Sequence, residues 1–496
     1  MIELALFLQV VVWLAVWGIF LASGQASIFH PATYYLAFHG VVFVLRPLLV
    51  YFLDFHSVWD YMQLEPDEGT FVSTLAVTSV GLVVLTGMCL CVGKTPPQFD
   101  AESAPLVSAL QLRALQWTIL ILSPLIAYSI YSTRGGAETS GERAANGVFI
   151  QTHSTGYIND AQFFVAPILC AWLLATQFRW HNLLPIALYV GYRSYVGWSR
   201  WTILLFFAMV VIEFCWYRRL RWLPVWTLAV AIPVLMLFNI LGHNRDLVKS
   251  YLTGKMVDAT QLADQLGIRP GMSEIERRDL RYDTQDFANF DYLTAYVALV
   301  PKRTGIYTYG SQYLQLFTEP IPRILWPGKP TGAPVKTFNL LDYGNFIGLT
   351  LSLVGDGWVS GGWIGVIITM GMAGFILGLA HRWFWRNCSK PILPLFYITF
   401  LGITPNWFRD GGISVTKFIL FTWLPLLVWV GVIWWFDQRR IHGTSIILRP
   451  GDSLRILQRE QSGRSDDSVT RSFLLVHPNV RNSWAIKSDP RRDGNE

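Results

Sequence analysis

Two aspartates and one histidine are the residues of this chain best placed to act as a general base. Asp291 lies in Asn289-Phe-Asp-Tyr292, between aromatic side chains that would raise the pKa of its carboxyl group. Asp356 lies in Gly355-Asp-Gly-Trp358, and His243 lies near the start of a long polar segment. An Asp or a His can take the proton from a sugar hydroxyl, which is otherwise a poor nucleophile. We expect Asp291 to be this base, with Asp356 and His243 as alternatives.

Several cations lie in segments that we expect on the outer side of a membrane, where positive charge is less common. Lys and Arg bind phosphate oxygens, and a guanidinium does so through two parallel hydrogen bonds. For each cation alone, the alternative is a side chain that reaches the membrane interface or pairs with a surface carboxylate. The cations expected to bind a diphosphate are Arg193, Arg200, Arg323, Lys329 and Arg409.

Tyr309 and Trp326 belong to a larger group of aromatic residues in the same outer segments. Aromatic residues concentrate at membrane interfaces, and sugar rings also stack on aromatic faces. The composition fits both roles. We expect these two side chains to contact a glycan.

The sequence carries none of the common motifs for nucleotide, dinucleotide, zinc-protease or serine-hydrolase chemistry. Its five cysteines fall in or beside apolar runs, without the spacing of metal ligands. We therefore expect no metal and no cofactor. The energy for a reaction would come from an activated substrate, such as a lipid diphosphate.

Long apolar segments must position these residues. Hydrophobic residues make up 52% of the 496 and charged residues 15%, whereas a soluble domain usually has about 25% charged residues. Runs of about 18 apolar residues, enough to cross a bilayer, recur along the chain. The sequence predicts an all-α, polytopic membrane helical bundle. The net charge of +6 lies largely in short loops and an Arg-rich tail, so it does not indicate nucleic-acid binding. About eleven spans are expected, at 3–22, 35–53, 71–92, 112–131, 161–178, 183–199, 201–217, 222–242, 361–380, 391–407 and 413–436.

The predicted spans divide the chain into four parts. Transmembrane helices occupy 1–242 and 349–436, a large loop with helical periodicity occupies 243–348, and 437–496 is a polar tail that we expect to be disordered. The Lys and Arg bias of the short loops places the N-terminus and the large loop outside, and the tail in the cytoplasm. The acidic loop 54–68, which has no Lys or Arg, falls on the outer side.

Several motifs in and after the large loop resemble those of the bacterial O-antigen and exopolysaccharide repeat-unit polymerases. The resemblance covers most of 1–436 and is specific over about 285–375. An Arg in a short outer loop near the C-terminal helices, here Arg409, fits the same pattern. The motifs are Asn289-Phe-Asp-Tyr292, Val300-Pro301, Tyr309-Gly310, Ile321-Pro-Arg323, Trp326-Pro-Gly-Lys-Pro330, Leu353-Val-Gly-Asp-Gly-Trp358 and Gly361-Gly-Trp-Ile-Gly365.

The resemblance implies an inverting, metal-independent glycosyltransferase with a GT-C-like helical architecture. Its substrates would be polyprenyl-diphosphate-linked oligosaccharides at the outer face of the bacterial cytoplasmic membrane. The growing glycan would pass from one lipid to a sugar hydroxyl of the next repeat unit, and the diphosphate lipid would leave. The implied partners are membrane lipids, a chain-length regulator and a repeat-unit flippase.

Two other functions remain open at this point. An O-antigen ligase, which transfers glycan to a lipid A-core acceptor, shares the architecture and is expected to centre on a loop histidine. A transporter or flippase of lipid-linked glycan should instead place ionisable residues inside membrane helices, often beside a broken helix. The charges of this chain gather in predicted outer loops, which favours the polymerase.

Overall fold

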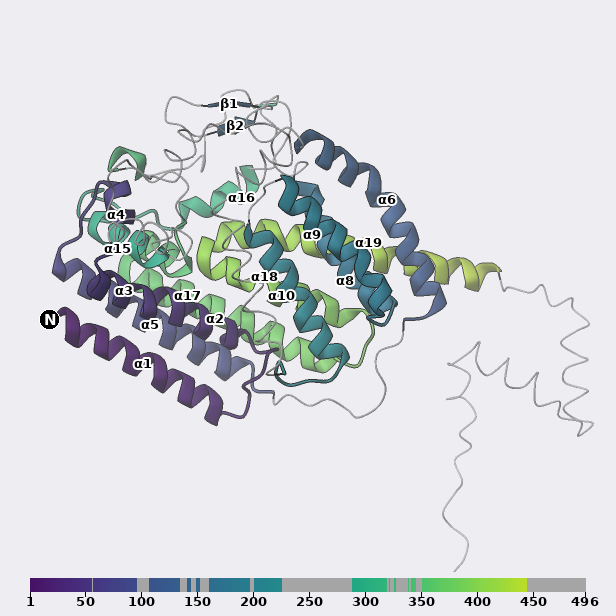
Figure 1. Ribbon diagram of the computed structural model, residues 1–496, viewed down its shortest axis with the longest axis horizontal. Helices are drawn as coiled ribbons and strands as arrows, with labels where there is room; N and C mark the ends of the chain where they lie inside the picture. Colours follow the sequence, from purple (N-terminus) through teal and green to yellow (C-terminus); the bar gives the residue numbers. More distant parts are fainter. Residues whose placement is uncertain are drawn as a thin grey trace, which may run out of the picture. The chain divides into compact units, whose positions relative to one another are not determined.

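A computed structural model represents the chain, and its described part is helical apart from one short hairpin (Figure 1). The hairpin pairs β1 (Gly141–Arg143) with β2 (Phe149–Gln151) in antiparallel register. The structure describes residues 1–55, 57–95, 107–133, 141–143, 149–151, 160–196, 200–224, 288–318, 321, 325–326, 338, 340–344 and 350–443.

The helices confirm the predicted class of a multi-pass membrane protein. Six of the described helices are long and apolar enough to cross a membrane. They are Ile2–Ala22, Pro31–Leu53, Glu68–Val92, Ala109–Tyr131, Leu353–Asn387 and Val415–Arg439.

The remaining predicted spans are shorter helices or lie elsewhere. Residues 161–178, 183–199, 201–217 and 391–407 fall on helices that are shorter or less apolar than the six, and 222–242 lies almost wholly outside the described residues. The bounds of the helices are α1 (Ile2–Ala22), α2 (Pro31–His39), the π-helix η1 (Gly40–Leu45), α3 (Arg46–Leu53), α4 (Ser57–Met62), α5 (Glu68–Val92), α6 (Ala109–Thr133), η3 (Asp160–Phe164), α8 (Val165–Ala175), η4 (Trp180–Leu183), α9 (Leu184–Val196), α10 (Arg200–Tyr217), α15 (Asn289–Leu299), η6 (Ser311–Leu314), α16 (Gln315–Thr318), η7 (Leu340–Asp342), α17 (Leu353–Asn387), α18 (Leu393–Asp410) and α19 (Gly412–Gly443).

The chain divides into two compact units, Met1–Ile433 and Trp434–Glu496. In the second unit the described residues end at 443 and belong to α19, where the Arg439 guanidinium lies 3.9 Å from the centre of the Trp435 ring. The predicted disorder of the tail concerns residues that lie mostly outside the described part.

Small residues bring α5 and α17 close together within the first unit. A Cβ on Gly378 would lie 2.9 Å from the Val92 Cβ, and a Cβ on Gly374 would meet the backbone oxygen of Leu85. Lipid tails are as apolar as Leu, so membrane helices rely on such close packing for association. The α5–α17 pair therefore forms a tightly packed base for the residues that α17 carries.

A sharp break at Gly361 and Gly362 divides α17. Gly362 has φ +59°, which a residue with a side chain rarely adopts. The break frees two carbonyl groups of the preceding turn, and the loop 304–310 supplies their partners. Thr308 N–H donates to the Val359 oxygen at 2.9 Å, and Tyr309 N–H donates to the Ser360 oxygen at 3.1 Å. Irregular backbone is tolerated at membrane depth where protein groups satisfy it in this way.

Replacing Gly357 with Ala is expected to destabilise the protein by about 1–3 kcal/mol, the usual range for overpacking. A Cβ at this position would lie 2.7 Å from the Val366 Cα, because the two halves of α17 cross here without side chains between them. Thermal unfolding in detergent measures the effect. Gly87→Ala is the matched control, since a Cβ there meets nothing within 4 Å. Equal unfolding temperatures for the two variants would contradict the close crossing.

Candidate functional site

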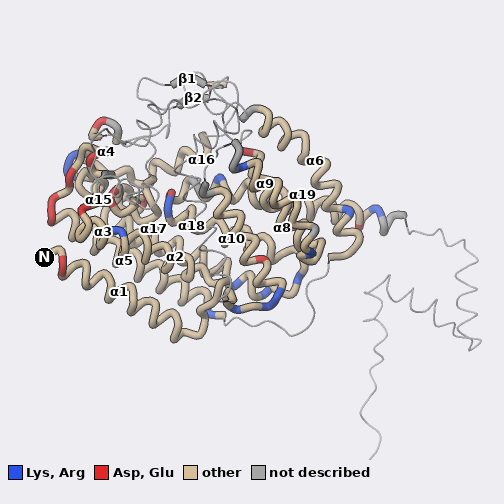
Figure 2. The backbone as a smooth tube through the Cα atoms, in the orientation of Figure 1, with Lys and Arg blue, Asp and Glu red and all other residues tan. Residues whose placement is uncertain are grey.

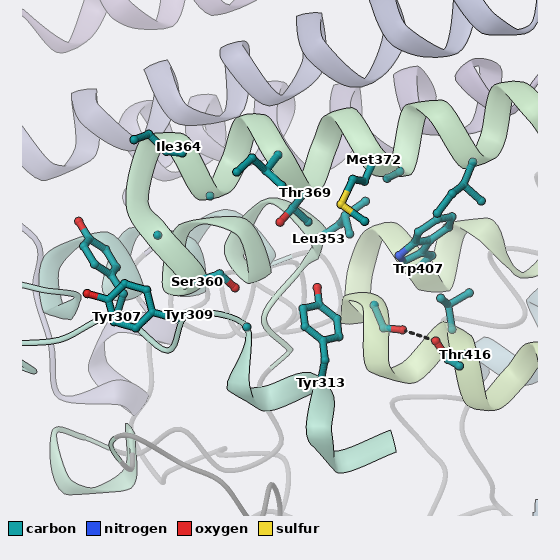
Figure 3. A pocket seen from close by; sticks show the side chains of 18 of the residues that line it. Tyr307, Tyr309, Tyr313, Leu353, Ser360, Ile364, Thr369, Met372, Trp407 and Thr416 are labelled. Atoms are coloured by element: carbon teal, nitrogen blue, oxygen red, sulfur yellow. Dashed lines mark hydrogen bonds between the residues drawn. The ribbon is translucent and has the colours of Figure 1, made fainter. Parts of the chain in front are cut away.

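A cavity of about 860 Å³ lies between α17, α18 and α19 and is bounded at one end by the loop 307–313 (Figure 3). The wall along the three helices is apolar, whereas tyrosines, a serine and glycines form the end next to the break in α17. Its polar end is formed by Tyr307, Tyr309, Gly310, Tyr313, Ser360, Gly361 and Gly412. The rest of its wall is formed by Leu353, Ile364, Gly365, Ile368, Thr369, Met372, Ala373, Ile376, Phe400, Trp407, Val415, Thr416 and Ile419.

Asp356 lies directly behind the polar end of this cavity, on the first half of α17. Its Oδ2 accepts a hydrogen bond from the Tyr313 hydroxyl at 3.3 Å and one from the Gly412 N–H at 2.6 Å. Asp356 is buried, while the hydroxyl of Tyr313 points toward the cavity in Figure 3. A proton released in the cavity can therefore reach the carboxylate through the Tyr313 hydroxyl.

Tyr313 is a hydrogen-bond donor toward Asp356. Burial raises the pKa of Tyr313 above its usual value, and the neighbouring carboxylate raises it further. The phenol therefore keeps its proton near neutral pH and donates a hydrogen bond to the carboxylate. Among the described residues both donors meet Oδ2, which leaves Oδ1 able to accept a further proton.

The end of α18 fixes the opposite side of Asp356. Gly411, with φ +84°, follows the last residue of α18 and packs directly on the Asp356 carboxylate. The backbone oxygen of Arg409 accepts the Ser352 N–H at 3.0 Å and the Asn289 side-chain N–H at 3.0 Å. The start of α17, the end of α18 and α15 are thus joined around the site, which limits the freedom of the carboxylate.

Tyr307 and Tyr309 line the polar end of the cavity. The Tyr307 hydroxyl lies against Gly362, 2.8 Å from where a Cβ would be, and the two rings are 6.2 Å apart at 71°. Tyr309 is 73% exposed, although loop hydrogen bonds hold its backbone. An exposed ring on a fixed backbone offers a flat apolar face, which is what a sugar ring needs for stacking. The structure thus places the predicted Tyr309 at the cavity.

Asp291, the predicted base, forms a buried ion pair with Arg46. The Arg46 Nε lies 2.8 Å from the Asp291 Oδ2, and their side chains are 4% and 1% exposed. The helix that carries Asp291, α15, is buried against α5, α3, α4 and α17, with Phe290 packed edge-on to Phe71. A general base must reach its substrate. The ion pair holds Asp291 outside the cavity wall, and its role as the base stays a prediction.

The predicted cations divide between two places. Arg193 is buried away from the cavity wall, where it donates to Gln162 at 2.8 Å and to Thr202 at 2.7 Å, above the Phe163 ring. Arg409 lies beside the site, and its guanidinium is 3.4 Å from the Asp410 carboxylate.

Burial raises the pKa of the Asp410 carboxyl above its usual value, and the charge of Arg409 opposes this shift. Both side chains of this pair are partly exposed, 15% for Arg409 and 19% for Asp410. Arg409 is therefore mostly buried, and it lies two residues before Gly411, which packs on Asp356.

Several predicted site residues lie outside the part that the structure describes. Trp326 is described and half-buried, and Arg200 begins α10 with its side chain among those not described. The residues that lie wholly outside the described part are His243, Arg323 and Lys329.

The prediction from sequence missed the importance of three residues. Arg46 lies in a predicted span and is 245 positions from Asp291, so no local pattern connects the two. Tyr313 and Gly412 become important only through Asp356, which they contact from other elements. The one local sign in the sequence was the Gly411-Gly412 pair after the charged residues Arg409 and Asp410, because glycine lets another group approach the backbone closely.

No cluster of three or more His, Cys, Asp or Glu that could hold a metal ion occurs among the described residues. Comparisons with protein-family models, with curated proteins and with solved structures find no match to this chain.

Proposed function

We propose that this chain is a membrane glycosyltransferase that joins polyprenyl-diphosphate-linked oligosaccharides, the reaction of a repeat-unit polymerase. One observation carries the proposal. An apolar cavity between α17, α18 and α19 ends at a tyrosine that is hydrogen-bonded to a buried carboxylate. An amphipathic substrate with a long apolar chain and a polar, reactive head matches this arrangement.

The apolar part of the cavity supports a lipid substrate. After the break, its wall on α17 runs from Ile364 to Ile376, twelve residues further along, or about 18 Å of helix. Most side chains of this wall are apolar, including Ile364, Ile368 and Met372. An isoprenoid chain would bury its surface here and place its head group beside Tyr313.

The proposed step begins with a sugar hydroxyl of the acceptor next to Tyr313. The hydroxyl oxygen attacks the anomeric carbon of the donor sugar, and the bond between that carbon and the diphosphate oxygen breaks. The acceptor proton passes to the Tyr313 oxygen while the Tyr313 proton passes to Asp356. The diphosphate lipid leaves with the electron pair of the broken bond, and the anomeric configuration inverts because attack and departure occur on opposite faces.

Cations would stabilise the negative charge that develops on the leaving diphosphate. Arg409 is adjacent to the site among the described residues, and Arg323 and Lys329 remain predicted contributors from the large loop. Tyr309, Trp326, Arg193 and Arg200 were predicted for the same substrate. Of these four, Tyr309 has the support of lining the cavity.

The distribution of charge supports the predicted orientation. Figure 2 shows Lys and Arg gathered where α10 ends, and mostly Asp and Glu around α4, with some Lys and Arg beside them. Arg221, in the region rich in Lys and Arg, donates hydrogen bonds to the Ala26 and Gly24 oxygens, which lie just after the end of α1. The positive-inside rule would put this end in the cytoplasm and the acidic end outside. The proposal therefore includes about eleven spans, a GT-C-like bundle and a bacterial cytoplasmic membrane with the cavity entrance on its outer side.

Purified protein supplied with one polyprenyl-diphosphate-linked repeat unit tests the proposed function. We expect a ladder of glycans that differ by one repeat, resolved by gel electrophoresis and mass spectrometry. A single transfer to a lipid A-core acceptor, without a ladder, would identify a ligase instead. The absence of any new glycosidic bond would reject both enzymes.

A transporter of lipid-linked glycan is the second candidate, and the break in α17 favours it. Transporters often bind substrate at discontinuous membrane helices, and the break at Gly361 and Gly362 lines the cavity. Buried Glu213 in the apolar helix α10 points in the same direction. Movement of a fluorescent lipid-linked glycan across vesicles, without bond formation, would support the transporter over the glycosyltransferase.

A further inference from the structure

Trp407 places a hydrogen-bond donor in the wall of the cavity. Its side chain is on the same face of α18 as Phe400, and the residue is 7% exposed. Among the described residues the indole N–H has no hydrogen-bond partner. Figure 3 shows the ring nitrogen on the side of the indole toward the cavity, although the nitrogen itself is covered, so a ligand oxygen reaches it through a small rotation of the ring. A buried donor without an acceptor is unfavourable in an apolar site, so it indicates a place where a ligand supplies the acceptor.

Other indoles of the chain have the acceptor that the Trp407 N–H lacks. Trp216, Trp358 and Trp423 each donate to a backbone oxygen at 3.0 Å. Trp17 and Trp172 also have no partner among the described residues, but neither lines the cavity. Trp407 therefore combines an unused donor with a position against an empty space large enough for a ligand.

The position of Trp407 along α18 defines which part of a ligand it would meet. Phe400, in the apolar stretch, is seven residues away, or about 10 Å along the helix axis. On the other side, the Gly411 N–H donates to the Trp407 oxygen, and Gly411 packs on Asp356. The indole N–H thus lies between the apolar stretch and the Tyr313–Asp356 pair. In a lipid-linked glycan diphosphate, the group between the chain and the sugar is the phosphate attached to the lipid.

We propose that the Trp407 indole N–H donates a hydrogen bond to an oxygen of the phosphate attached to an isoprenoid chain. The ligand class is a polyprenyl phosphate or diphosphate, and this identification rests on the proposed function. Hydrogen bonds to charged groups are stronger than those between neutral groups. This buried, uncharged donor would bind the phosphate where it joins the lipid, and so set the position of the lipid chain along the cavity.

Trp407→Phe tests the proposal, because it keeps an aromatic ring and removes the donor. The probes are a polyprenyl diphosphate, the polyprenol of the same length, and phosphatidylglycerol, each titrated against purified protein in detergent. We expect the variant to bind the diphosphate about tenfold or more weakly than the wild-type protein. We expect its affinity for the polyprenol to be unchanged, because that ligand has no phosphate.

Trp423→Phe is the matched control. The Trp423 N–H donates to the Phe396 oxygen, and Trp423 does not line the cavity. Without ligand, Trp423→Phe should lower the unfolding temperature, because it removes the hydrogen bond from the indole N–H to the Phe396 oxygen and leaves that oxygen with the Thr399 hydroxyl as its side-chain donor. Trp407→Phe should not lower it, because among the described residues the indole N–H makes no hydrogen bond that could be lost. For the diphosphate, by contrast, we expect Trp407→Phe to bind more weakly than Trp423→Phe.

Three results would overturn the proposal. An unchanged affinity of Trp407→Phe for the diphosphate would remove the donor from the site. An equal loss for polyprenol would show that ring packing is responsible. An equal loss for phosphatidylglycerol would show a general phospholipid contact. The assay forms no glycosidic bond, so a failed ladder with a Trp407-dependent affinity would reject the proposed function and leave this inference standing. A glycan ladder together with an affinity that does not depend on Trp407 would support the proposed function and reject this inference.

Discussion

Asp356→Asn is expected to lower the rate of glycan polymerisation by about 10²–10⁴-fold, the usual contribution of a general base. The amide oxygen can still accept hydrogen bonds from Tyr313 and Gly412 but cannot take a proton. The variant should therefore fold and bind lipid-linked substrate as the wild-type protein does. Initial rates of ladder formation by the purified variant give the measurement.

Tyr313→Phe provides the second arm of this experiment. It removes the hydroxyl that connects the cavity with Asp356, so the rate should fall to a similar extent. Residues that act as a unit are not additive, and the double variant should be no slower than Asp356→Asn alone. Asp342→Asn is the control, since Asp342 is an exposed carboxylate and should keep full activity. Multiplicative losses in the double variant would show that the two residues act separately.

Arg46→Met is expected to destabilise the protein by about 3–5 kcal/mol, because it leaves the Asp291 carboxylate buried without its cation. The effect is large because α15 is buried among membrane helices, where water does not compensate a charge. Thermal or denaturant unfolding in detergent measures the loss. A change below about 1 kcal/mol would mean that the pair is not buried as the structure shows.

The double variant Arg46→Met, Asp291→Leu separates a structural role of Asp291 from a catalytic one. Replacing both members of a buried ion pair with apolar residues is often neutral or stabilising, so we expect stability to recover. If the pair is structural, polymerisation should recover as well. A double variant that is stable but inactive would indicate that Asp291 is the base and that Asp356 is not.

Much of the fold could be predicted from the sequence, because membrane spans depend on local composition. A run such as Leu4 to Leu21 is apolar whatever surrounds it, and its backbone must form its own hydrogen bonds in lipid. The structure accordingly has α1 over Ile2–Ala22. The predicted span at 361–380 was shorter than α17, because its first turns lie before a break that apolar length alone does not reveal.

The site could be predicted only in part, because it depends on contacts between distant segments. Asp356 was recognised as a candidate from its position before an apolar run, but its partners Tyr313 and Gly412 are 43 and 56 positions away. The preference for Asp291 rested on its aromatic neighbours, which are indeed buried beside it. The deciding contact is with Arg46, and periodicity and spacing carry no information about a pair so far apart.

The most direct test of the account counts products of a single reaction. Purified wild-type protein in vesicles receives a defined polyprenyl-diphosphate-linked repeat unit, and released polyprenyl diphosphate and new glycosidic bonds are quantified together by mass spectrometry. We expect one diphosphate lipid released for each bond formed, and neither product above background with Asp356→Asn. Release of the lipid without joined repeats, or equal yields from the wild-type protein and the variant, would contradict it.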